Sequence, residues 1–341
     1  MSLEPAARRV AAIDCGTNSI RLLVADVDPV HRTLTDIDRR LEIVRLGQGV
    51  DATGRLAPDA LQRTLGALRE YAGIIAASQV SAVRMVATSA TRDASNAAGF
   101  TRGVLDVLGV APEVLTGDEE AWLSFAGATA EFGSMEGADE GGMGRRAGGG
   151  EPPAAPYLVL DIGGGSTEFV LGGDSAGDAA GEPGDGVSAT SMNIGCVRMT
   201  ERHLHADPPS GEQIAAATAD IDAALTTAAQ KVDIARAKTL VGLAGSVTTV
   251  AAVALGLPGY DAMRIHHSRI SAARVHEVTT RLLAQTRAER AAIPSMHPGR
   301  IDVIGGGALV LDRVMERFGF PEVVVSEHDI LDGIAWSLVP A

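Results

Sequence analysis

Lysine is nearly absent from this sequence, and its scarcity excludes a large class of phosphate-binding proteins. Of the 29 Lys and Arg residues, Lys231 and Lys238 are the only lysines. A P-loop needs a lysine directly after its glycine run, and no glycine-rich segment here is followed by one. P-loop ATPases and GTPases are therefore excluded.

Aromatic residues and cysteines are also scarce. Aromatics make up 3% of the chain, so Val, Leu, Ile and Ala must fill most of the core. Two cysteines, Cys15 and Cys196, give no disulfide framework and fit a reducing compartment. Residues 1–15 contain charges and no long apolar stretch, so we expect no signal peptide and a cytoplasmic location.

Long apolar runs are few, and one of them needs interpretation. Residues 239–260 carry no charge and are long enough to suggest a membrane span. Gly242, Gly245 and several Ser and Thr residues interrupt the run. We therefore expect a buried strand, a glycine turn and a buried helix, and no membrane partner.

The charge balance is acidic. The 29 basic and 43 acidic side chains give a formal net charge of −14. Such a chain is a poor nucleic-acid binder overall, so no nucleic-acid partner is expected. A polyanionic substrate would need a local pocket of arginine, metal and backbone N–H groups. The sequence leaves a homodimer open.

The order of elements predicts an α/β protein of two domains. At roughly 150 residues per domain, 341 residues correspond to about two. The apolar periodicity predicts a helix over 58–77, strands over 83–87 and 113–115, and a helix beginning near Arg92. Thr116 is the expected N-cap of a further helix. Residues 131–156 and 172–186 are rich in glycine and predict flexible loops.

An internal repeat is the most informative feature. Residues 9–26 and 157–172 each contain an apolar run, a D-x-G-x-x-S sequence and a second apolar run. We call residues 14–19 the first turn and residues 161–166 the second turn. Two copies at half-chain distance predict two homologous domains, each offering one turn to a shared cleft.

The two turns have the composition of a phosphate and metal site. Glycine allows backbone N–H groups to approach phosphate oxygens closely, and serine adds a hydroxyl donor. Asp14 and Asp161 would face each other with a divalent metal between them. The predicted phosphate-binding residues of the turns are Gly16, Thr17, Asn18 and Ser19 in the first and Gly163, Gly164, Gly165 and Ser166 in the second.

These motifs resemble those of the exopolyphosphatase/guanosine pentaphosphate phosphohydrolase (Ppx/GppA) family. The resemblance spans nearly the whole chain and includes segments 87–92, 116–121, 242–246, 299–302 and 325–327. The amino-acid sequences of the motifs resemble those of the short actinobacterial exopolyphosphatases that lack a C-terminal HD-like domain. The resemblance implies two actin-like (ribonuclease H-like) domains of the actin/Hsp70/sugar-kinase superfamily with an interdomain cleft. We expect them to comprise residues 1–130 plus 326–341, and 131–325 with a flexible insertion at 133–156.

The resemblance also implies catalytic roles. Glu120 matches the general base, whereas Glu119 is expected only to favour the start of its helix. Glu168 would face the cleft beside Asp161 and Asp14, and these three carboxylates would hold Mg²⁺ or Mn²⁺. Arg92 would clamp a phosphate, with help from a helix N-terminus. Gly245 and Ser246 would form a third phosphate-binding turn, and Arg21 has no dependable role.

A cysteine-dependent phosphatase is the rival interpretation. Cys15 with Arg21, and Cys196 with Arg202, fit C-x5-R. Asp14 would raise the pKa of the neighbouring thiol, which opposes this chemistry. The pairs His266–His267 and His203–His205 lack an accompanying Cys or carboxylate at metal-ligand spacing.

The expected activity is metal-dependent hydrolysis of the terminal phosphate of inorganic polyphosphate, with Glu120 activating water. Conversion of pppGpp to ppGpp in the same site is the alternative within this class. An actin-superfamily phosphotransferase and a nucleotide-binding regulator without turnover remain open outside it.

Overall fold

The computed structural model describes residues 7–130, 132, 153–173 and 187–339. The chain divides into two compact units. Unit 1 comprises Met1–Ala130 and His328–Ala341, and unit 2 comprises Glu131–Glu327. Each unit has one sheet and its own hydrophobic clusters. The loops predicted at 133–156 and 172–186 lie almost entirely outside the described residues.

Unit 1 is built on a five-stranded mixed sheet in the order β3-β2-β1-β4-β5. Its strands are β1 (Arg8–Cys15), β2 (Ser19–Asp28), β3 (Thr33–Ile43), β4 (Ala82–Ala87) and β5 (Glu113–Val114). β1 pairs antiparallel with β2 and parallel with β4, which places Asp14 opposite Arg21. The strand-turn-strand predicted for the first copy of the repeat is confirmed.

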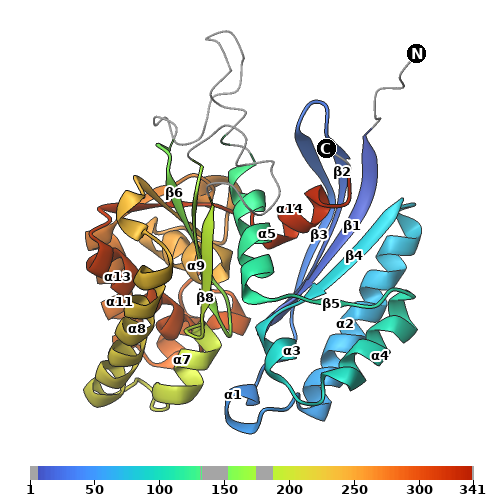
Figure 1. Cartoon of the computed structure of the whole chain (residues 1–341). Coiled ribbons are helices and arrows are strands. Elements are labelled where there is room, and N and C mark those ends of the chain that lie inside the picture. Colours follow the sequence, from blue (N-terminus) through green and yellow to red (C-terminus); the bar gives the residue numbers. More distant parts are fainter. Residues whose placement is uncertain (1–6, 131, 133–152, 174–186, 340–341) are drawn as a thin grey trace. The chain divides into compact units, whose positions relative to one another are not determined.

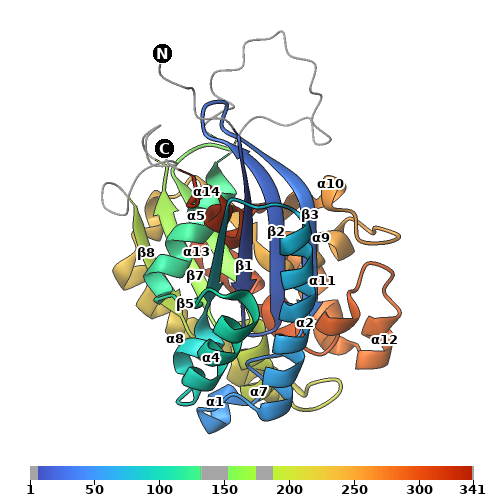
Figure 2. The same ribbon diagram turned by 90° about the vertical axis from the view of Figure 1, so that its right-hand side faces the viewer.

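Helices cover both faces of this sheet (Figure 1). They are α1 (Val50–Thr53), α2 (Pro58–Ala77), α3 (Ser89–Asp93), α4 (Ala97–Leu108), α5 (Gly117–Thr129) and α14 (Ile330–Trp336). Figure 2 shows α2 and α4 together in front of the sheet. Ile13 packs with their apolar residues, whereas Ala12 packs with those of α5 and α14. Because side chains alternate along a strand, Asp14 lies on the same face as Ala12, toward α14.

One helix of unit 1 begins later than predicted. Arg92 lies in the last turn of the short helix α3, and the next helix starts only at Ala97. Asn96 does not cap that helix, because its side chain binds both backbone groups of Leu56, at 2.8 and 2.9 Å. The expectation that a helix N-terminus assists Arg92 is therefore wrong.

Unit 2 is built on a six-stranded mixed sheet in the order β10-β11-β9-β6-β7-β8. Its strands are β6 (Tyr157–Ile162), β7 (Thr167–Gly172), β8 (Ser188–Met192), β9 (Thr239–Leu243), β10 (Arg269–Ser271) and β11 (Glu322–Val325). β6 and β7 form an antiparallel hairpin, with Asp161 opposite Glu168. The second copy of the predicted strand-turn-strand is thereby confirmed.

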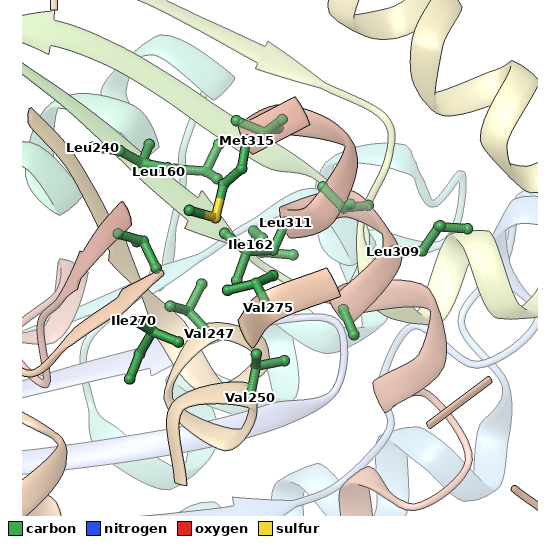
Figure 3. Packing of buried hydrophobic residues seen from close by; sticks show 14 of the residues in the cluster. Leu160, Ile162, Leu240, Val247, Val250, Ile270, Val275, Leu309, Leu311 and Met315 are labelled. Atoms are coloured by element: carbon green, nitrogen blue, oxygen red, sulfur yellow. The ribbon is translucent and has the colours of Figure 1, made fainter. Parts of the chain in front are cut away.

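The helices of unit 2 enclose a large aliphatic core. They are α7 (Cys196–His203), α8 (Gly211–Lys231), α9 (Ala244–Ala254), α10 (Ala262–Ile265), α11 (Ala272–Ala284), α12 (Arg287–Ala291) and α13 (Ile304–Phe318), with 3-10 turns at Ile234–Arg236 and Pro298–Arg300. Leu160 and Ile162 of β6 lie with Leu311 of α13 in this core (Figure 3). Asp161 lies between them in sequence and therefore points to the opposite face of the sheet.

The uncharged run at 239–260 forms a strand and a helix, as predicted. Its sharp junction occurs at Ala244, which has a φ of 63°, and Gly245 already belongs to α9. The residue that turns the chain is therefore an alanine, contrary to the predicted glycine turn. In the described ranges, no helix is both long and apolar enough to cross a membrane.

Candidate active site

The two turns of the repeat have the same backbone hydrogen bond. Gly16 N donates to Ser19 O at 2.9 Å, and Gly163 N donates to Ser166 O at 3.0 Å. The strands on each side pair in matching register, with Cys15 opposite Ile20 and Ile162 opposite Thr167. The sequence repeat therefore corresponds to a repeated local structure.

The carbonyl groups of the second turn are bound by the start of α7. Cys196 N donates to Gly163 O at 2.9 Å, and Val197 N donates to Gly164 O at 2.9 Å. Arg198 Nε donates to Gly165 O at 2.7 Å. Within the described residues, no hydrogen bond uses the N–H of Gly164 or Gly165. Successive N–H groups of this kind can bind an anion such as phosphate.

The first turn is supported in a similar way by the segment after β3. Gly47 N donates to Thr17 O at 2.8 Å, and Asn18 O accepts hydrogen bonds from the N–H groups of Val44 and Arg45. The Thr17 hydroxyl lies 2.9 Å from the Ser89 hydroxyl at the start of α3. These bonds fix the turn from one side, and Asn18 contributes to its shape through its carbonyl.

Each turn rests against a glycine that sequence reasoning missed. A Cβ atom on Gly47 would lie 2.3 Å from Thr17 Cγ2, and one on Gly195 would lie 2.3 Å from the carbonyl carbon and oxygen of Gly164. At Gly195 the contact is with backbone atoms that cannot give way, whereas at Gly47 the Thr17 side chain would have to shift. A sequence signal existed, since each glycine follows an apolar residue just after the third strand of its copy, as in Leu46-Gly47 and Ile194-Gly195.

Asp14 is buried and bound on one side by an arginine. Its Oδ2 accepts hydrogen bonds from Arg21 Nε at 3.0 Å and Arg21 Nη2 at 2.7 Å. Its Oδ1 is buried and has no hydrogen-bond partner among the described residues. Burial raises the pKa of the Asp14 carboxyl above its ordinary value, although Arg21 opposes this effect. One oxygen of this predicted metal ligand is therefore still able to accept a cation.

The second turn has a different charge at the equivalent place. Arg21 follows Asp14 by seven residues, and Glu168 follows Asp161 by seven, so the arginine and the glutamate are counterparts in the repeat. Cross-strand partners have Cβ atoms about 4.5–5.5 Å apart and face the same side of the sheet. Glu168 is buried and accepts a 2.7 Å hydrogen bond from the Ser191 hydroxyl. Unit 2 thus pairs two carboxylates where unit 1 pairs an acid with a base.

Glu119 and Glu120 take different positions at the start of α5. The Thr116 side chain and Glu119 form a capping box, in which Glu119 Oε2 accepts from Thr116 N at 2.8 Å. Glu120 is buried, and its Oε2 lies 3.1 Å from Arg92 Nη1. The same Arg92 atom also donates to Leu115 O at 2.9 Å. The predicted N-cap Thr116 is confirmed, and Glu119, expected only to favour the start of its helix, takes part in the capping box. The structure also brings the predicted base and the predicted phosphate clamp together.

Gly245 and Ser246 do not form a separate turn. Both belong to the first turn of α9, and Ser246 is buried. The guanidinium of Arg300 lies over Gly245, because a Cβ atom there would be 1.6 Å from Arg300 Nη2. The expected third turn is therefore a helix start that carries an arginine, to which the sequence assigned no role.

The cysteine-phosphatase interpretation is not supported. Cys15 is buried, and burial followed by the adjacent Asp14 raises the pKa of its thiol far above its ordinary value. Burial also raises the pKa of the Cys196 thiol. Arg202 binds Asp220 at 3.2 Å, so it is engaged at the helix surface. A thiolate nucleophile is therefore disfavoured at both cysteines.

The histidine pairs have structural contacts. The rings of His266 and His267 stack with centroids 3.7 Å apart, and His266 Nδ1 accepts from Glu327 N at 3.2 Å. His203 Nε2 lies 2.9 Å from Asp220. In the part of the chain that the structure describes, no group of three or more His, Cys, Asp or Glu side chains could hold a metal ion.

The predicted metal ligands suit a hard divalent cation by their chemistry. All three are carboxylates, and the buried Oδ1 of Asp14 is the kind of oxygen that such a cation binds. Asp14 belongs to unit 1, whereas Asp161 and Glu168 belong to unit 2. Their convergence on one cation stays a prediction.

Comparisons with known proteins agree on one family. The sequence pattern of the Ppx/GppA phosphatase family matches residues 23–341. Exopolyphosphatase 2 of Mycobacterium tuberculosis is 48% identical over 97% of this chain and 98% of its own length. The crystal structure of an exopolyphosphatase-like protein, 45% identical, superposes with a TM-score of 0.86 over 97% of this chain and 98% of that one.

A longer relative has a different substrate in its name. The guanosine-5'-triphosphate,3'-diphosphate pyrophosphatase of Aeromonas salmonicida is 26% identical over 96% of this chain, which spans 59% of that protein. The predicted α/β fold class is confirmed by the two mixed sheets, and the solved relatives share this fold. The chain therefore belongs to the Ppx/GppA phosphatase family, a family of hydrolases.

Proposed function

We propose that this protein is an exopolyphosphatase that hydrolyses the terminal phosphoanhydride bond of inorganic polyphosphate. The observation that carries the proposal is the pair of turns with the same Gly N to Ser O hydrogen bond. The 48% identical relative that is an exopolyphosphatase supports the choice of substrate. The two buried free thiols fit a reducing compartment, so we propose the cytoplasm as the location.

In the proposed site, both turns would contribute donors to the terminal phosphate. The N–H groups of Gly164 and Gly165 and the hydroxyls of Ser19 and Ser166 would donate to its oxygens. Asp14, Asp161 and Glu168 would hold Mg²⁺ or Mn²⁺, which neutralises charge on the phosphate oxygens when it is bound. Gly245 and Ser246, with the nearby Arg300, would contact a more distant part of the substrate.

Glu120 is the proposed general base. It would take a proton from the water that attacks the terminal phosphorus, while the leaving oxygen of the next phosphate departs in line. Arg92, 3.1 Å from the Glu120 carboxylate, would orient that carboxylate and bind an equatorial phosphate oxygen. Water and one anhydride bond are consumed, and inorganic phosphate and the shortened chain are released.

Phosphate release tests this proposal directly. Short polyphosphate, long polyphosphate and pppGpp would be assayed side by side, with Asp161→Asn purified in parallel as the control for contaminating phosphatases. We expect release from polyphosphate that EDTA abolishes and Mg²⁺ or Mn²⁺ restores. Faster turnover of pppGpp would assign the activity named for the Aeromonas relative. Full activity after exhaustive chelation would refute the proposed metal dependence. The absence of phosphate release from any of the substrates would refute the proposed hydrolase activity.

A further inference from the structure

A buried contact links the far end of the chain to the first turn. Arg21 in β2 binds Asp329, the N-cap of α14, across 308 residues of sequence. Asp14, Arg21 and Asp329 all belong to unit 1. Asp14 and Asp329 are 4% and 5% exposed, so solvent screens this contact little.

One guanidinium is shared between two carboxylates. Arg21 directs Nε and Nη2 to Asp14 Oδ2 and Nη1 to Asp329 Oδ2. The planar guanidinium holds its donors at fixed angles, so the position of Asp329 also fixes the angle at which Arg21 meets Asp14. Asp14 Oδ1 takes no part in this contact and has no hydrogen-bond partner in the described ranges.

The charges of this cluster do not balance. Asp14, Arg21 and Asp329 sum to one negative charge. The neighbouring pair Arg39 and Asp332, joined at 2.5 Å, adds one positive and one negative charge, and Arg39 also binds the exposed Asp36, so it brings no surplus positive charge. A buried net charge is costly unless a counter-charge is present. The unpartnered Oδ1 of Asp14 is the atom of the cluster where a cation could be accommodated.

We propose that Asp329 is a positioning residue that sets the cation affinity of Asp14. By sharing Arg21, Asp329 prevents this arginine from fully neutralising Asp14 and leaves Oδ1 negative and directed toward a bound cation. This inference rests on the proposed metal-dependent function. Residues that orient a metal ligand without touching the metal typically change metal affinity by about 10–100-fold when they are replaced.

The alternative role for Asp329 is purely structural. Its Oδ1 caps α14 by accepting from Leu331 N at 2.9 Å, and its own N–H donates to Asp332 Oδ2 at 2.9 Å. A variant must therefore remove the charge and keep the cap. Asp329→Asn and Asp329→Ser both do so, because Asn and Ser are good N-cap residues.

The matched control is Asp332→Asn. Asp332 is a buried carboxylate on the same helix and belongs to the same capping box. It contacts Arg39 and Asp329 N, and its removal also takes one negative charge from the cluster. Asp332 has no hydrogen bond to Arg21. This variant therefore tests whether the loss of a nearby negative charge weakens cation binding when the contact between Asp329 and Arg21 is kept.

Direct Mn²⁺ binding, followed by the electron paramagnetic resonance signal of free Mn²⁺ in the absence of substrate, is the principal measurement. We expect Asp329→Asn and Asp329→Ser to raise the Mn²⁺ Kd by about tenfold or more. Asp332→Asn should raise it by less than about threefold. Thermal melting of each variant verifies folding, and the metal concentration for half-maximal phosphate release should rise in parallel with the Kd.

The outcomes distinguish this inference from the proposed function. Unchanged Mn²⁺ affinity in both folded Asp329 variants, or equal weakening in Asp332→Asn, would overturn the role of Asp329. The absence of Mn²⁺ binding by the wild-type protein would overturn it as well. A wild-type protein that binds Mn²⁺ but releases no phosphate would refute the proposed function, and the affinity difference between variants would still decide the role of Asp329.

Discussion

At the residue scale, two adjacent glutamates show how a helix separates functions. Successive side chains of an α-helix point about 100° apart, so Glu119 and Glu120 face different surroundings. Glu119 closes the capping box, and the Thr116 N–H and hydroxyl lower the pKa of its carboxyl. Glu120 is buried beside Arg92, and the proposed reaction assigns it the role of proton acceptor.

Exchanging each glutamate for glutamine tests this division. Glu120→Gln keeps the size of the side chain and removes the proton acceptor, so kcat should fall by about 10²–10⁴-fold with little change in KM. Single-turnover phosphate release would measure this effect. Glu119→Gln is the matched control and should retain most of the activity. If only Glu119→Gln lost activity, the base would be assigned one residue too late.

The effect of Glu119→Gln on stability should depend on pH. Because the pKa of Glu119 is lowered in the folded state, its charged form stabilises the fold above the ordinary value of 4.5. That contribution is lost as the pH falls through the lowered pKa. The melting temperatures of wild type and Glu119→Gln should therefore converge in acid.

At the element scale, the turns depend on the close backbone contacts behind them. The N–H groups that begin α7 bind the carbonyls of the second turn, and Gly195 permits this approach. The contact is between backbone atoms, which cannot move aside as a flexible side chain would. The shape of the second turn is therefore set by a residue outside the D-x-G-x-x-S motif.

Gly195→Ala tests the support of the second turn. The added Cβ would meet the Gly164 carbonyl at 2.3 Å, so we expect a loss of about 1–3 kcal/mol in the free energy of unfolding. Polyphosphate hydrolysis should fall as well, because the turn is displaced. Gly211→Ala in the same unit has nothing within 4 Å of its Cβ and should unfold like wild type or later. Denaturant titration of both would decide, and equal stabilities would contradict the argument.

Elements that depend on local sequence patterns are predicted correctly. Element boundaries and contacts that depend on residues far apart in the sequence are not. The helix α2 and the four strands beside the two turns follow from apolar periodicity and turn residues. The helix start near Arg92 could not be located, because the chain is held there by Asn96 binding Leu56, 40 residues away. The contact between Arg21 and Asp329 spans 308 residues and leaves no trace in local sequence.

At the scale of the whole molecule, each unit has its own core. One large cluster of buried residues belongs to unit 2, and two others belong to unit 1. Units with separate cores can open independently, because local unfolding exposes mainly the contacts within one of them. A destabilising substitution in one core should then increase local unfolding mostly in that unit.

Hydrogen exchange of two core variants tests this independence. Leu240→Ala removes a fully buried side chain from unit 2, and Leu22→Ala does the same in unit 1. Each should cost about 2–5 kcal/mol. We expect faster amide exchange mainly in β6 and β9 for the first variant and in β1 and β2 for the second. Equal acceleration across both units would show that they unfold as one.

The two hairpins carry opposite charges at one matching position, and this has a genetic consequence. Arg21 stands opposite Asp14, whereas its counterpart Glu168 stands opposite Asp161. An assembly of identical single-hairpin subunits would carry the same residue in every copy. A basic residue in one hairpin and an acidic residue in the other require two separately encoded segments, each free to mutate without the other. Two hairpins in one chain can therefore carry different residues at matching positions, which identical subunits cannot do.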